Sequence, residues 1–120
     1  MADKEQKDTK VQKALSKLVS DEWFAGQTYR QFILLVKPED RSKIAGEMLD
    51  VANDELDDHL RSLVDFGLSY GFSVPSTYNE MKKEVSKEDL KLFEDCKKGQ
   101  DAEFYLDQAI EAEKRAIETY

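Results

Sequence analysis

Residues 45–70 read AGEMLDVANDELDDHLRSLVDFGLSY. Apolar residues and one histidine recur in this stretch at alternating steps of four and three: Ala45, Leu49, Ala52, Leu56, His59, Leu63, Phe66 and Tyr70. Such spacing is typical of the narrow apolar seam of a helix in a helical bundle. The pattern predicts a helix from about Asp40 to Tyr70 with a lone histidine in its seam.

Two more long helices are predicted around this one, from about Thr9 to Val36 and from about Gln100 to the end. Their stripes are Val11, Leu15, Leu18, Glu22, Ala25, Tyr29, Ile33 and Val36, and Ala102, Leu106, Ala109, Glu113, Ala116 and Tyr120. A short helix is predicted between Ser86, where Ser86-Lys-Glu-Asp89 has the pattern of a capping box, and Gly99. Because no segment sustains a period of two, we expect an all-α protein.

Composition excludes several classes of function. The 120 residues suffice for one domain, and 18 Lys and Arg against 26 Asp and Glu give a net charge of −8. Nucleic-acid binding, which needs a clustered basic surface, is therefore not expected. A single cysteine, Cys96, excludes an internal disulfide framework, and no apolar run is long enough to cross a membrane. We expect a cytoplasmic protein that contacts no membrane.

The two ends of the chain differ in character. Residues 1–9 are almost wholly polar and are predicted to form a disordered tail, leaving residues 10–120 as the helical domain. The last stripe stays in helical phase through Tyr120 without a glycine cap. The sequence therefore suggests a fragment of a longer protein.

Carboxylates stand in the predicted stripes where leucine would be ordinary. Glu22 and Glu113 lie mid-stripe, and Glu55 lies one turn before His59 at the edge of its seam. An unpaired buried carboxylate loses several kcal/mol of solvation, and the inner stripes of the three long helices carry no Lys or Arg. A bound cation or shared protons must compensate for that loss.

The three carboxylates can converge. Glu22 and Glu55 lie almost equally far from Pro38 along two antiparallel helices, roughly 24–26 Å at 1.5 Å per residue. Glu113 reaches the same level if residues 72–98 cross the length of the bundle, so that the last helix runs parallel to the second. Glu55 and His59 are four residues apart on one helix face. Carboxylate oxygen with imidazole nitrogen suits iron first, with manganese or zinc also possible.

These motifs resemble those of a known family. Leu-Val-Ser-Asp-Glu22-Trp-Phe-Ala-Gly-Gln-Thr-Tyr29, Asn-Asp-Glu55-Leu-Asp-Asp-His59-Leu and Ala-Ile-Glu-Ala-Glu113-Lys-Arg-Ala are similar to the first three helices of ferritin-like di-iron carboxylate proteins, the bacterioferritin and rubrerythrin relatives in particular. The resemblance implies an antiparallel bundle with a long crossover, whose two iron ions react with dioxygen or peroxide.

The resemblance also implies a role for each matching residue. Glu22 would be a terminal ligand of one iron, Glu55 a bridging ligand and His59 a terminal ligand of that same iron. Glu113 would be a terminal ligand of the second iron. Tyr29, two turns after Glu22, would hydrogen-bond near the site and donate an electron.

Two departures from the family pattern shape the expectations. The family has Glu-x-x-His, whereas this chain has Glu55-x-x-x-His59 with Asp58 at the expected histidine. Either a π-bulge absorbs the added residue or Asp58 is the ligand, and the seam position favours His59. The fourth helix is absent, so the site would be completed by a longer chain or by another subunit, and we expect a homo-oligomer.

A second hypothesis needs no metal. In it the helices form an interaction module that self-associates through its seams, and the carboxylates pair with basic residues of a partner. His59 is then a hydrogen-bonded seam residue, and a chelator leaves the melting temperature unchanged. Nucleotide-dependent catalysis is not expected, because the sequence has no Gly-rich phosphate loop.

Overall fold

The computed structural model describes the backbone of residues 2–119 and the side chains of residues 9–118. Over that range the chain is helical with no strand, which confirms the prediction of an all-α protein. The α-helices are α1 (Ala2–Leu35), α2 (Arg41–Asn53), α3 (Leu60–Ser69), α4 (Tyr78–Glu84), α5 (Lys87–Glu94) and α6 (Ala102–Thr119). A 3₁₀ turn, η1 (Pro38–Asp40), precedes α2, and a π-helical segment, η2 (Asp54–His59), joins α2 to α3. Tyr120, the last residue of the predicted final stripe, lies outside the described residues.

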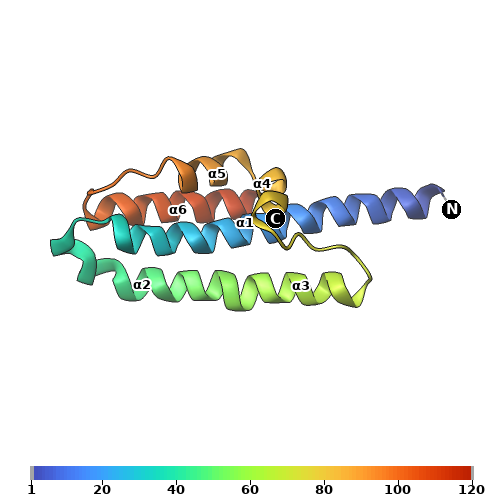
Figure 1. The fold of residues 1–120 in the computed structure, drawn as a ribbon, viewed down its shortest axis with the longest axis horizontal. Coiled ribbons are helices and arrows are strands. Elements are labelled where there is room, and N and C mark those ends of the chain that lie inside the picture. Colours follow the sequence, from blue (N-terminus) through green and yellow to red (C-terminus); the bar gives the residue numbers. More distant parts are fainter. Residues whose placement is uncertain (1, 120) are drawn as a thin grey trace.

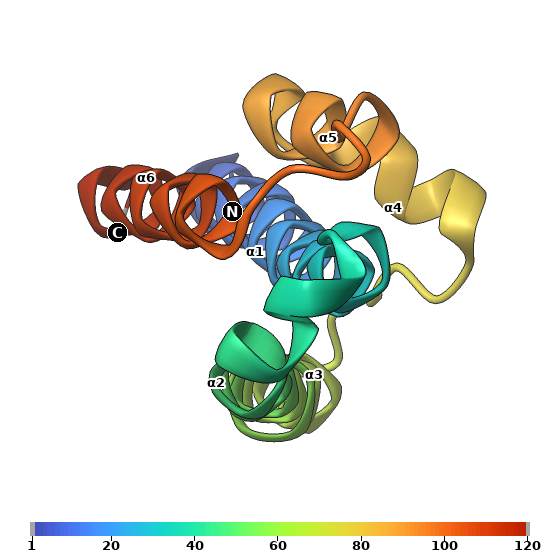
Figure 2. The ribbon, with the colours of Figure 1, turned by 90° about the vertical axis from the view of Figure 1, so that its left-hand side faces the viewer.

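The helices are arranged around α1 (Figure 1). The continuous rod α2–η2–α3 runs antiparallel to α1, and α4 and α5 then lead back along α1 to the end where α2 began. As a result α6 runs in the same direction as α2–η2–α3. Seen end-on, α1 has α6, the α2–α3 rod and the α4–α5 segment on three different sides (Figure 2).

The turn after α1 is tied to the start of α6. Gly99, in the positive-φ conformation that glycine adopts without strain, donates its N–H to the carbonyl of Leu35 at 2.7 Å. The N–H of Ala102 donates to Oδ2 of the buried Asp40 at 2.9 Å. This bond and the neighbouring Lys43 lower the pKa of Asp40. These contacts place α6 directly beside α1.

One hydrophobic core joins α1, α2 and α6. Its buried members are Tyr29, Phe32, Val36, Ile44, Met48, Ala52, Ala102, Tyr105, Ala109 and Ala112. The rings of Phe32 and Tyr105 lie 5.2 Å apart, and the Tyr105 hydroxyl donates to the carbonyl of Lys97 at 2.6 Å. The small alanines of α6 allow it to pack closely against α1, as its predicted stripe implies.

The α4–α5 segment covers another side of α1 with aromatic contacts. The Phe93 ring lies 5.2 Å from that of Phe24, and the Tyr78 ring lies 6.0 Å from that of Trp23. The helix α4 is not among the predicted helices. Its signal is the N-cap Thr77, whose hydroxyl accepts a hydrogen bond from the N–H three residues later at 3.2 Å.

The start of the chain differs from the expectation of a disordered tail, because α1 already begins at Ala2. Lys, Glu, Gln and Ala, which dominate residues 2–13, are all strong helix formers. This polar end of α1 extends past the other helices (Figure 1). No helix among the described residues is both long and apolar enough to cross a membrane.

The seam predicted for residues 45–70 is only partly correct. In α2 the buried residues are Ile44, Met48 and Ala52, whereas Leu49 is exposed. In α3 the buried position is Gly67, and the predicted seam residues Phe66 and Tyr70 are exposed. In α3 the cause is η2, because a π-turn carries an additional residue and changes the register between the helices that flank it, whereas in α2 the buried face is centred one residue earlier than predicted.

Candidate metal centre

The π-turn brings Glu55 and His59 together. The two residues lie on adjacent turns within η2, and Nδ1 of His59 is 3.2 Å from Oε2 of Glu55. In the tautomer that carries its proton on Nδ1, His59 donates this hydrogen bond to the carboxylate, which only accepts. Of the two alternatives that the sequence left for the added residue, the structure therefore has the π-turn. Asp58 is exposed and does not belong to the cluster of metal-ligating groups.

Glu22 completes a compact group from the neighbouring helix. Its Oε2 lies 3.6 Å from Nδ1 of His59, and the donor atoms of Glu22, Glu55 and His59 all lie within 4.8 Å of one another. The predicted convergence of Glu22 and Glu55 is thus observed. Glu22 is 6% and Glu55 5% exposed, whereas the His59 side chain is 57% exposed. Two buried carboxylates thus meet one imidazole at the surface.

Gly26 allows η2 to approach α1 this closely. A Cβ atom built on Gly26 would lie 2.5 Å from Cγ and 2.8 Å from Cδ2 of Leu56, the residue that follows Glu55. Such distances are shorter than van der Waals contact, so any side chain at position 26 must displace Leu56. The glycine therefore sets the spacing between the two helices beside the candidate site.

We expect Gly26→Ala to destabilise the protein. The overpacking against Leu56 costs about 1–3 kcal/mol, which exceeds the gain of about 1 kcal/mol in helix propensity. Gly46→Ala is the matched control, because nothing lies within 4 Å of its Cβ, and it should stabilise by about 0.5–1 kcal/mol. Urea unfolding of both variants measures the difference; equal stabilisation by both would refute the close contact at Gly26.

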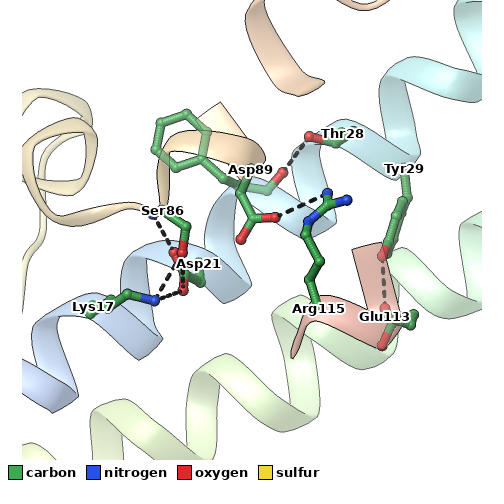
Figure 3. Close-up of polar contacts among 9 residues, drawn as sticks. Lys17, Asp21, Thr28, Tyr29, Ser86, Asp89, Glu113 and Arg115 are labelled. Carbon is green, nitrogen blue, oxygen red and sulfur yellow. Dashed lines mark hydrogen bonds and ion pairs between the residues drawn. The ribbon is translucent and has the colours of Figure 1, made fainter. Parts of the chain in front are cut away.

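The third predicted carboxylate, Glu113, lies on the same cavity but outside the compact group. This cavity of about 260 Å³ is lined by residues of α1, α5 and α6 and by Glu55, and both Glu22 and Glu113 contribute to it. The Tyr29 hydroxyl donates to Oε1 of Glu113 at 2.7 Å (Figure 3). Burial, and next the bond to Glu113, raise the pKa of Tyr29, so its phenol stays protonated.

A second set of charged residues holds α5 against α1 at the cavity. Asp21 accepts hydrogen bonds from the N–H of Ser86 at 2.7 Å and from its hydroxyl at 2.9 Å, and Lys17 lies 2.9 Å from the same carboxylate (Figure 3). The predicted capping box at Ser86 is therefore wrong, because the hydroxyl donates to Asp21, accepts from Lys17 and makes no cap hydrogen bond. Ser86 is still the residue that precedes α5.

Asp89 and Arg115 join α5 to α6 across the same cavity. Their closest atoms are 3.7 Å apart, and Figure 3 shows the pair between Asp21 and Tyr29. Burial, and next the charge of Asp21, raise the pKa of Asp89 to about 6. Neither residue was predicted as part of the site, because neither lies on a predicted stripe and only the fold brings α5 against the cavity.

The group fits a divalent transition-metal ion. Donor atoms bound to one ion at about 2.0–2.2 Å lie no more than about 4.4 Å apart, so small side-chain movements would bring all three into range. Two carboxylates and one imidazole match the preferences of iron, manganese and zinc better than those of calcium. Three protein ligands would leave coordination positions open on such an ion, as in reactive rather than purely structural sites.

Comparisons with known proteins assign the chain to no family. No family model, curated protein or solved structure matches the chain.

Proposed function

We propose that this chain is a ferritin-like iron-handling protein that binds ferrous iron through Glu22, Glu55 and His59. The single observation that carries the proposal is the convergence of two buried carboxylates and an imidazole from two helices within 4.8 Å. Ferrous iron is the substrate, and dioxygen or peroxide would accept its electron. Manganese or zinc would fit the same donor atoms.

The arrangement of the helices supports the ferritin-like assignment. A helical hairpin, a connection that leads back along its length and a third long helix parallel to the second make up the order that the motifs imply (Figure 1). Each long helix contributes a carboxylate to one cavity, as that family resemblance would require. The compact group accounts for one metal position, and a second ion at Glu113 remains an expectation of the resemblance.

The buried charges give the proposal its physical basis. Two carboxylates in a protein interior repel each other and lose solvation, and a divalent cation between them removes both costs. The carboxylates would also balance the additional positive charge when ferrous iron becomes ferric. His59 supplies a neutral ligand at the solvent-exposed edge of the site.

Tyr29 and Glu113 supply a path for a proton beside this site. The phenol of Tyr29 donates its hydrogen bond directly to Oε1 of Glu113. When the dioxygen or peroxide oxidant takes an electron from Tyr29, the phenolic proton can move to Glu113, so that the buried ring keeps no positive charge. We propose Tyr29 as the redox-active side chain.

Iron oxidation by purified variants tests the proposal. Ferrous iron added without oxygen, followed by dioxygen, should give a ferric absorbance in the wild-type protein that Glu22→Gln reduces at least tenfold, because glutamine keeps the shape and removes the charge. Glu47→Gln, on an exposed position of α2, is the matched control and should behave as wild type. An unchanged ferric signal in Glu22→Gln would refute the assignment.

A further inference from the structure

Two apolar stripes with exposed members lie on helices that carry residues of the candidate site. The α3 stripe begins at the ligand His59 and continues with Leu63, Phe66 and Tyr70. The α6 stripe contains Glu113 and consists of Leu106, Ile110, Glu113 and Ile117. Phe66 is 44%, Tyr70 70%, Ile110 53% and Ile117 74% exposed. Each stripe spans about three turns of helix. It is therefore a continuous apolar surface, unlike the single exposed apolar residues that are ordinary on proteins.

The α6 stripe does not face α5. The opposite flank of α6 is marked by Phe104, Gln108 and Arg115, which line a second cavity together with residues of α5. Ile110 and Ile117 lie one turn to either side of Glu113, whose carboxylate reaches the cavity shared with Glu55. The described part of the chain contains no further helix to cover this face.

The spacing of the two stripes is the same. Both have steps of four, three and four residues, which is the spacing of helices that pack side by side with interlocking side chains. Because α3 and α6 run in the same direction (Figure 1), a two-fold axis across them sets α3 of one copy antiparallel to α6 of another. The reciprocal contact forms by symmetry, as an isologous dimer requires.

The charges of the stripes favour a second copy over a basic partner. The whole chain carries −8, yet the two stripes hold only one imidazole, His59, and one carboxylate, Glu113. In the two-fold arrangement the imidazole stripe faces the carboxylate stripe, so the contact joins unlike groups while the acidic surfaces stay outside it. We propose that these stripes form the interface of a homodimer in which the second copy covers His59 and closes the open side of the metal site.

Sedimentation of the full chain tests the interface. The wild-type protein should sediment as a dimer, and Ile110→Asp should weaken the dimer at least tenfold by burying a charge in the α6 stripe. Leu34→Asp is the matched control, because Leu34 is 73% exposed on α1 outside both stripes and should leave the dimer intact. Unchanged helical circular dichroism of both variants shows that they fold.

A wild-type monomer at all concentrations would overturn the proposal and would leave another chain as the cover of this face. A dimer that Ile110→Asp does not weaken would overturn it as well, because the contact would then lie elsewhere.

The coupling to metal rests on the proposed function and is tested separately. Ferrous iron should tighten the wild-type dimer at least tenfold and should have no effect on the dimer of Glu22→Leu, which keeps both stripes. If iron has no effect on the wild type while Ile110→Asp still dissociates it, the interface stands and the metal coupling is overturned. Loss of the dimer in Glu22→Leu under metal-free conditions would contradict an interface made by the stripes themselves.

Discussion

Replacing Glu22 by leucine is expected to raise the melting temperature of the metal-free protein and to abolish the further rise that ferrous iron produces. Glu22 and Glu55 are both almost completely buried, and each lies within 3.6 Å of the same His59 nitrogen. Substituting apolar residues of similar volume for buried charged groups is often neutral or stabilising by about 1–4 kcal/mol. Leucine is close to glutamate in volume and removes one of the two charges.

The iron-induced rise in melting temperature that Glu22→Leu loses should be larger than the change in melting temperature that it causes in the metal-free protein. Ferrous iron at 100 times its dissociation constant stabilises a folded protein by about 2.7 kcal/mol, which corresponds to roughly 10 °C in a chain of this size. Glu22→Leu keeps only one carboxylate and the imidazole, so this rise should vanish. Thermal unfolding followed by circular dichroism without oxygen, with iron and then with chelator, measures both effects.

Glu47→Leu is the control for that experiment, because Glu47 is exposed on α2 and takes no part in the cluster. It should keep the full iron-induced rise. Glu22→Leu could instead melt at a lower temperature than the wild type without metal and still respond to iron. Glu22 would then be a structural residue, and this result would support the hypothesis of a metal-free interaction module.

The long helices and the convergence of Glu22 and Glu55 could be predicted from periodic patterns in the sequence. A period of 3.6 defines each helix, and carboxylates in the stripes of α1 and α6 stand out because burial is costly for them. Equal distances from Pro38 then place Glu22 opposite Glu55 without knowledge of the fold. These inferences succeed because each depends on local spacing along a regular helix.

The details that failed depend on contacts between distant segments. Ser86 was predicted to cap α5 with its own hydroxyl, but Asp21 of α1 competes for that group. Asp89 and Arg115 lie off the stripes, and they meet at the cavity only because the fold brings α5 and α6 together there. Periodicity along one segment carries no information about such a partner.

The seam of residues 45–70 failed for a different reason. Its steps of four and three continue evenly through residues 54–59, where the backbone changes to a π-helix. A uniform period continues the face of Leu49 to Phe66, whereas the buried residues are Met48 before the π-turn and Gly67 after it. The exposed Phe66 and Tyr70 are then left as the apolar stripe assigned above to the second copy.

Deleting Asp57 is expected to leave the protein folded and able to bind iron, although a deletion within a helix is ordinarily severe. A π-turn contains one residue more than the α-helical turn that it replaces, so removing an exposed residue from η2 restores a regular helix while the register of α3 against α1 is kept. Gly67 then still faces Leu15, whose Cδ2 lies 2.7 Å from a Cβ built on the glycine.

The deletion also converts Glu55-x-x-x-His59 into the Glu-x-x-His spacing of the resembling family. Residues three apart on an α-helix share a face, so both ligands stay beside Glu22. We expect the melting temperature of the deletion variant to stay within a few degrees of the wild type, with the rise in ferrous iron retained. Circular dichroism melting with and without iron measures both.

Deletion of Arg30 in α1 is the matched control, because Arg30 is also exposed but lies in a regular α-helix. There the loss of one residue rotates the rest of the helix by about 100°, turns Phe32 and Val36 out of the core and should cost several kcal/mol. If both deletions unfolded the protein alike, η2 would not be a removable insertion. If the Asp57 deletion variant folded but its melting temperature no longer rose with ferrous iron, the π-turn itself would be needed to orient Glu55 and His59 toward the metal.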